Sequence, residues 1–410
     1  MITNDAVLFG ILALMLGGVF YTTASSHPFW KTFYKWLPAL LVCYFLPSLL
    51  NSFGLVDAEN SKLYFVASRY LLPASLVLLT LSIDFRRIIA LGPKALIMFI
   101  TGTVGIIIGG PIAIMIMSWI SPDVVGGHGP DAVWRGMTTI AGSWIGGGAN
   151  QAAMKEIYGV GDQMFSVMVT IDIIVANIWM AALLFFAARS TQIDSWNGAD
   201  TSAISELQNT VEAFHKKHDR KPELTDLMLI VAIAFGVVGF SHFGADYLSA
   251  AISNMEGMQN SNLSSHFFWL VVLATTCGLL LSFTRARKFE AVGASKVGSV
   301  FIYILVATIG LKMDVTAIGD TPAMFVVGGI WMLVHASLLL IVAKLIKAPV
   351  FFMAVGSQAN VGGAASAPVV ASAFHPSLAP VGVLLAVLGY ALGTYAALLT
   401  GTLMQMVAPA

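Results

Sequence analysis

Twelve long apolar stretches constrain this chain more than any other feature. Each lies near the about 20 residues that cross a bilayer as a helix, and only 10% of all residues are charged, against roughly 25% in soluble proteins. Backbone groups in lipid must pair within helices or closed barrels. Helix-length stretches exclude a β-barrel and a soluble enzyme with one anchor, so we expect an all-α polytopic membrane protein. The stretches span about 6–24, 36–53, 63–83, 95–120, 134–154, 163–188, 224–245, 265–284, 294–313, 322–346, 348–374 and 378–407.

One long polar connection divides these stretches into two groups of six. Two motifs recur in the same order in both groups: Gly142–Ala153 resembles Gly356–Ala367, and Leu81–Asp84 resembles the run that ends at Asp314. Internal repeats of this kind are common in transporters. We therefore predict three parts. They are a first membrane repeat (1–188), a polar cytoplasmic linker (189–223) and a second membrane repeat (224–410).

Basic residues predict the topology. Lys and Arg gather after the first, third, sixth, eighth and tenth stretches, and such connections are typically cytoplasmic. Three stretches then separate two cytoplasmic connections, so one of them should not cross. Stretch 134–154 is the candidate, because successive glycines cost about 1 kcal/mol each in a helix. Stretch 348–374 has the same character. Each repeat would contain five crossings and one Gly-rich re-entrant hairpin or broken helix, which makes the repeats inverted and places both termini outside.

The two Gly-rich tips are the candidate site. Irregular backbone at membrane depth persists only inside protein or beside a cavity, helix N-termini favour anions, and unwound carbonyls suit Na⁺. The alternative is that these glycines only let helices pack closely. The candidate substrate-binding residues are Ser143, Gly146, Gly147, Gly148, Asn150, Gln151, Ser357, Gln358, Asn360, Gly362, Gly363 and Ser366.

Asp172 lies in the middle of a predicted span, where an ionisable side chain costs at least ~2.5 kcal/mol and indicates function. We expect it to couple transport to an ion, as a ligand of Na⁺ or a carrier of H⁺, with Thr170 or Asn177 nearby in sequence. The alternative is a structural carboxylate that accepts hydrogen bonds from a neighbouring broken helix. Asp84 and Asp314 end corresponding stretches and are secondary ion-site candidates, although solvation at the membrane surface also explains them.

The Gly142–Asn150 run, the Gly356–Gly363 run and the Leu81–Asp84 segment resemble the YjcL-like membrane proteins, a family defined by domain of unknown function 819. That family is grouped with a superfamily of cation:proton antiporters and anion transporters, which includes glutamate, citrate and bile-acid sodium symporters. The resemblance implies an elevator-type carrier with a panel and a transport core. It implies no substrate.

The leading functional hypothesis is a secondary active transporter, most simply a Na⁺ symporter of a small organic anion. The alternatives are a cation:proton antiporter that uses Asp172 and a non-transporting sensor or scaffold that acts through 189–223. We found no phosphate loop, zinc spacing or nucleophile motif, so we expect no enzyme and no cofactor other than Na⁺ or H⁺. The expected location is the bacterial inner membrane. The expected partners are lipid and an organic anion, not nucleic acid, and a homodimer is compatible with the sequence.

Overall fold

A computed structural model describes residues 1–37, 39–58, 60–201, 204, 222–255, 258, 262–312, 322–375 and 378–409. Within these ranges the chain is almost entirely helical, and the extended structure is one isolated bridge between Ile2 and Val56. Asp314, and linker residues 202–203 and 205–221, lie outside the described residues. The expectation of an all-α membrane protein is met.

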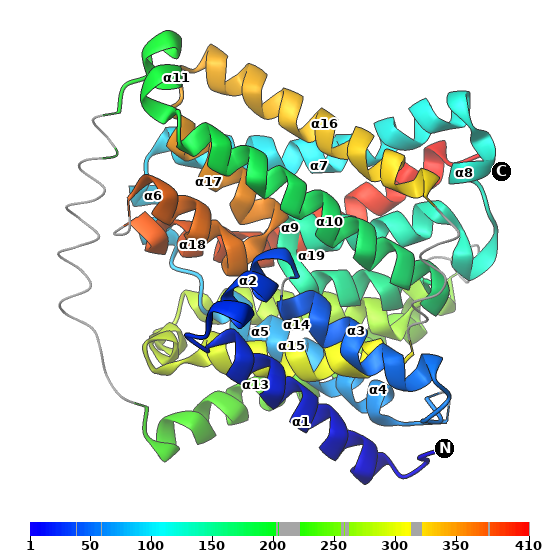
Figure 1. Ribbon diagram of the computed structural model, residues 1–410. Helices are drawn as coiled ribbons and strands as arrows, with labels where there is room; N and C mark the ends of the chain where they lie inside the picture. The colour runs from blue at the N-terminus through cyan, green and yellow to red at the C-terminus, as the bar shows by residue number, and fades with distance from the viewer. Residues whose placement is uncertain are drawn as a thin grey trace.

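The helices form two groups that pack side by side (Figure 1). We call the first the flanking bundle. It consists of α1 (Asp5–Thr23), α3 (Ala39–Ser52), α4 (Leu63–Val66), the π-helix η1 (Ala67–Leu71), α5 (Leu72–Leu81), α13 (Leu224–Ser253), α14 (His266–Ser282) and α15 (Ala294–Gly310).

The second group, the hairpin bundle, contains both Gly-rich segments. It consists of α7 (Pro93–Ile120), α9 (Val133–Ile157), α10 (Asp162–Ala187), α16 (Ala323–Leu345), α17 (Val350–Val361), α18 (Gly363–Phe374) and α19 (Ala379–Val407). Short helices connect these elements: α2 (Pro28–Trp36), α6 (Phe85–Ala90), α8 (Pro122–Val125), η2 (Gly129–Asp131), α11 (Ser190–Asn197), η3 (Asn262–Ser264) and η4 (Arg285–Val292). Each bundle takes helices from both halves of the sequence.

Seven helical segments of the described chain are long and apolar enough to cross a membrane. An eighth is reached if α14 and η4, which meet at 94°, count as one span. Two other expected crossings are shorter helices, the 14-residue α3 and the 17-residue α15. Large apolar side chains cover the outside, and Leu14 and Trp119 are 79% and 94% exposed. Such a surface fits lipid rather than water. The count of ten crossings stays a prediction.

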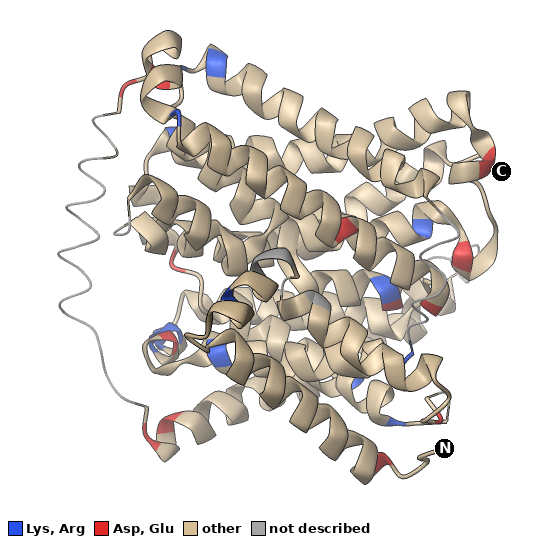
Figure 2. Cartoon of the chain, in the orientation of Figure 1, with Lys and Arg blue, Asp and Glu red and all other residues tan. Residues whose placement is uncertain are grey.

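Charged residues lie mainly at helix ends and in connections (Figure 2). Both termini and α8 lie at one end of the molecule, and α6 and α11 lie at the opposite end (Figure 1). Two connections that we expect to be cytoplasmic, 86–94 and the start of 189–223, therefore share an end that neither terminus reaches.

Candidate functional site

The first Gly-rich segment, α9, is a helical hairpin that turns at Gly147. A straight helix of its 25 residues would be about 37 Å long. Instead, Arg135 Nη1 near its start donates to the Tyr158 carbonyl just past its end at 2.5 Å. A Cβ on Gly142 would lie 2.6 Å from the Asn150 carbonyl oxygen, so the two arms touch. Gly147 makes the turn with φ 72° and ψ −174°, a conformation essentially reserved for glycine.

The second Gly-rich segment is also a hairpin, formed by α17 and α18. The chain breaks at Gly362 and turns at Gly363, whose φ is 57°. The rings of Phe351 and Phe374, at the far ends of the two arms, are 5.3 Å apart between centroids. Near the turn, Gln358 Nε2 donates to Ser366 Oγ at 2.6 Å. Both segments that we expected not to cross therefore fold back on themselves.

The hairpins enter the bundle from opposite ends. The first follows α8 and η2, whereas the start of the second is fixed to α11 by a hydrogen bond of 2.8 Å from the Val350 N–H to Asp194 Oδ1. Burial raises the pKa of Asp194, and this hydrogen bond acts in the opposite direction. The two hairpins meet at α19, where a Cβ on Gly389 would lie 2.6 Å from the Ile145 carbonyl and 3.6 Å from that of Ala359.

Each hairpin tip carries a fully buried asparagine that is clamped in the same way. Asn150 Oδ1 accepts from Thr394 Oγ1 at 2.5 Å, and its Nδ2 donates to the Gly146 and Tyr390 carbonyls. Asn360 Oδ1 accepts from Thr103 Oγ1 at 2.7 Å, and its Nδ2 donates to the Gly356 and Phe99 carbonyls at 3.0 and 2.9 Å. In both cases a threonine and the carbonyl four residues before it come from one long helix, α19 or α7.

Asp172 joins the two arms of the first hairpin to α10. Its Oδ1 accepts from Trp144 Nε1 at 2.6 Å, and its Oδ2 accepts from Gln151 Nε2 at 2.8 Å. Ser143, half-buried near the tip, interacts with the same carboxyl group. Gln151 also accepts a hydrogen bond from Tyr44 of the flanking bundle at 3.3 Å. Asp172 thus has the contacts that the structural alternative described, and its role in ion coupling stays a prediction.

The other ion-site candidates bond elsewhere. Thr170 Oγ1 donates to the Ser166 carbonyl and Asn177 Nδ2 to the Ile173 carbonyl, both within α10. Asp84, at the end of α5, accepts from Arg287 Nη1 of η4 at 3.0 Å. The structure therefore places none of these three in direct contact with Asp172, and Asp314 lies outside the described residues.

His335 is a site residue that the sequence did not reveal. It is fully buried on α16, with Nδ1 3.0 Å from the Gly102 carbonyl and Nε2 2.8 Å from Ser357 Oγ. Because a carbonyl only accepts, Nδ1 carries the proton, and in the neutral ring Nε2 accepts from Ser357. Trp179 of α10 also donates to Ser357, at 2.8 Å. The only sequence signal was a histidine within an apolar stretch.

Gln358 leaves one polar atom without a partner at the second tip. Its Oε1 is buried and accepts no hydrogen bond within the described chain, although its Nε2 is bonded to Ser366. A buried acceptor without a donor is costly and indicates a place for an ion or a ligand. The glycine backbone of the tips is more accessible, since Gly147, Gly148 and Gly362 are half-buried.

Replacing Thr394 by valine should lower stability by about 1–2 kcal/mol, because the buried Asn150 Oδ1 loses its donor. The matched control is Thr402→Val on the same helix, whose exposed hydroxyl bonds only to the Leu398 carbonyl. Thermal unfolding of the purified protein in detergent measures both. Equal midpoints for the two variants would show that the clamp contributes nothing.

Comparison with known proteins gives the family. The model described as "Protein of unknown function (DUF819)" matches residues 7–407, nearly the whole chain. This chain belongs to the DUF819 family. A curated member of similar sequence is "Uncharacterized membrane protein YjcL" of Bacillus subtilis (strain 168), 25% identical over 379 residues that cover 88% of this chain and 89% of that protein. The family resemblance expected from the Gly-rich runs is confirmed, and it carries no assigned activity.

Proposed function

We propose that this DUF819 protein is a secondary active transporter of the bacterial inner membrane, which couples Na⁺ to the movement of a small organic anion. The observation that carries the proposal is the meeting of two hairpins from opposite ends at α19, each with a clamped, buried asparagine at its tip. Two half-helices, the second arm of α9 and α18, begin at these tips and favour negative charge there.

Transport requires movement, because Asn150 and Asn360 are fully buried. We propose an elevator-type motion in which the hairpin bundle slides against the flanking bundle and carries the substrate with it. The opposite entry of the hairpins and the sharing of both bundles between the two sequence halves support inverted repeats as the origin of the fold.

The coupling ion would bind at the tips as well. A carboxylate offers about four acceptor positions, and two hydrogen bonds to Asp172 leave capacity for Na⁺ or H⁺. Gln358 Oε1 offers a further oxygen. The second candidate function, cation:proton antiport at Asp172, differs in one respect: Na⁺ would release protons from the purified protein without any organic substrate.

The test is uptake of radiolabelled mono-, di- and tricarboxylates into proteoliposomes, driven by an imposed Na⁺ or pH gradient. We expect gradient-dependent uptake of at least one compound and a loss of ten-fold or more in Asn150→Ala and Asn360→Ala. Asn177→Ala is the matched control, because its amide bonds only to its own helix. Uptake that is independent of both gradients and unchanged in the two tip variants would refute the proposal.

A further inference from the structure

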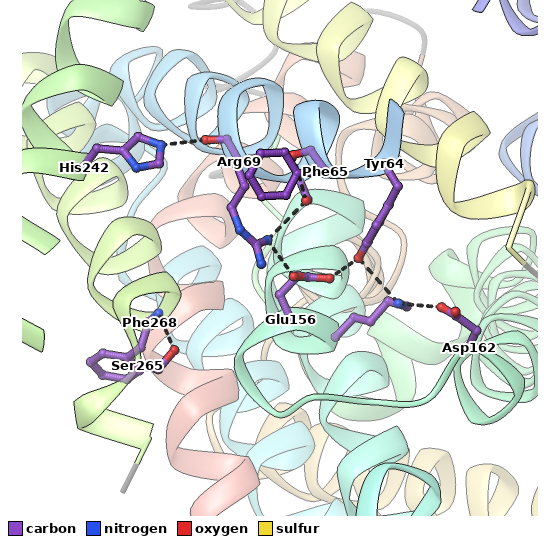
Figure 3. Close-up of polar contacts among 10 residues, drawn as sticks. Tyr64, Phe65, Arg69, Glu156, Asp162, His242, Ser265 and Phe268 are labelled. Carbon is purple, nitrogen blue, oxygen red and sulfur yellow. Dashed lines mark hydrogen bonds and ion pairs between the residues drawn. The ribbon is translucent and has the colours of Figure 1, made fainter. Parts of the chain in front are cut away.

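A network of ionisable side chains joins the far end of the first hairpin to the flanking bundle (Figure 3). Glu156, at the end of α9, accepts from Arg69 Nη1 of η1 at 2.6 Å and from the Tyr64 hydroxyl of α4. Its neighbour Lys155 pairs with Asp162 of α10, with 2.8 Å between Nζ and Oδ1. The side chains of Glu156 and Lys155 are only 14% and 6% exposed.

The two ion pairs differ in what they connect. Lys155 and Asp162 both belong to the hairpin bundle, so their pair survives any motion of that bundle as a unit. Arg69 and Tyr64 belong to the flanking bundle, so Glu156 loses both partners if the bundles slide apart. A shielded carboxylate without a counter-charge is strongly disfavoured. Lys155 is already paired with Asp162 and is no spare cation.

Arg69 can be left behind at less cost. Its side chain is 27% exposed, its Nη1 also donates to Ser68 Oγ at 3.2 Å, and its guanidinium lies 4.4 Å from the Phe267 ring centroid. These contacts are all within the flanking bundle, and a guanidinium over an aromatic ring is a favourable arrangement. The imbalance therefore falls on Glu156, not on Arg69.

We propose that a monovalent cation, Na⁺ or H⁺, replaces Arg69 at Glu156 when the hairpin bundle leaves the flanking bundle, which makes Glu156 a coupling site separate from Asp172. The inference rests on the bundle motion of the proposed function. The charged and titratable groups around this site are Tyr64 of α4, Arg69 of η1, Lys155 of α9, Asp162 of α10, His242 of α13 on the Arg69 carbonyl, and Lys312 over the Tyr64 ring.

A binding test needs no substrate. In Arg69→Met the internal cation is gone, and Glu156 is open to an added one. We expect the thermal unfolding midpoint of this variant in detergent to rise with Na⁺, in NaCl against choline chloride at equal ionic strength, or with falling pH, more steeply than in the wild type. Arg69→Met/Glu156→Gln should lose that response. Lys312→Met is the control, because it removes a nearby cation that touches the Tyr64 ring and not Glu156. An Arg69→Met midpoint that follows Na⁺ and pH as the wild type does would overturn the inference.

A transport test separates this inference from the proposed function. Glutamine at position 156 keeps an acceptor for the Tyr64 hydroxyl but needs no counter-charge. In proteoliposomes, the number of cations moved per substrate, measured from reversal potentials, should fall by one in Glu156→Gln. An unchanged ratio in an active variant would contradict the role of Glu156 and leave the transporter intact. If wild-type protein takes up none of the carboxylates under any gradient, the proposed function fails, and the Na⁺ and pH titration of Arg69→Met still decides whether Glu156 binds a cation.

Discussion

Replacing Gly147 by alanine should abolish most uptake and lower stability by about 1–3 kcal/mol. Gly147 holds φ 72° and ψ −174° at the turn of the first hairpin, and a side chain in that region of backbone space is strained by an amount of this order. The strain is relieved only if the turn opens, which separates Trp144 and Gln151 and disturbs the Asp172 contacts. Thermal unfolding in detergent and uptake in proteoliposomes measure the two effects.

Gly148→Ala is the matched control for this prediction. Gly148 has an ordinary backbone conformation, and the nearest atom to an added Cβ would be Ile302 Cγ2 at 3.9 Å. Alanine is also the better helix former, so this variant should keep its stability and its uptake. If Gly147→Ala and Gly148→Ala behave alike, the turn geometry is not what matters at this tip.

Asp172→Ala should destabilise the protein by roughly 2–5 kcal/mol, because it leaves two buried donors, Trp144 Nε1 and Gln151 Nε2, without an acceptor. Each unsatisfied donor costs about 1–3 kcal/mol. Asp172→Asn should cost less, since its carbonyl still accepts from one of them, while its amide meets the other donor. The comparison variant is Asn177→Ala, which removes a half-buried amide bonded to the Ile173 carbonyl of its own helix.

Thermal unfolding midpoints of these three variants order the effects. The expected order of stability is Asn177→Ala highest, Asp172→Asn intermediate and Asp172→Ala lowest. Asp172→Ala with the stability of Asn177→Ala would mean that the carboxylate does not hold the hairpin arms together. Uptake by Asp172→Asn adds a separate result: coupling at this position predicts that the folded variant loses its response to the ion gradient.

The hairpins were predictable because charge parity and helix propensity agree. Basic residues on both sides of 134–154 required an even number of crossings, and Gly146–Gly148 marked the segment least suited to span. The same glycines also serve the alternative reading, since Gly146 packs directly against Gly393 of α19. Close packing and a tight turn are both needed when two hairpins are enclosed by long helices.

The partners of the site residues were not predictable, because they come from distant parts of the chain. Thr103 is 257 residues from Asn360, and Thr394 is 244 from Asn150. Nothing in their local sequence distinguishes them from threonines that bond within their own helix, as Thr170 does. The pairing of Glu156 with Arg69 was likewise hidden, because residues near the ends of apolar stretches suggest solvation at the membrane surface.

The most direct test of the central claim, that substrate binds between the hairpin tips, is substrate protection of a cysteine placed there. In a background without Cys43 and Cys277, the account predicts that Gly148→Cys reacts with a membrane-permeant maleimide and that a transported carboxylate with Na⁺ slows the reaction several-fold. Ser372→Cys, on α18 away from the tip, should react at a rate that the substrate leaves unchanged. Equal rates at Gly148→Cys with and without a carboxylate that the wild type transports would contradict the claim.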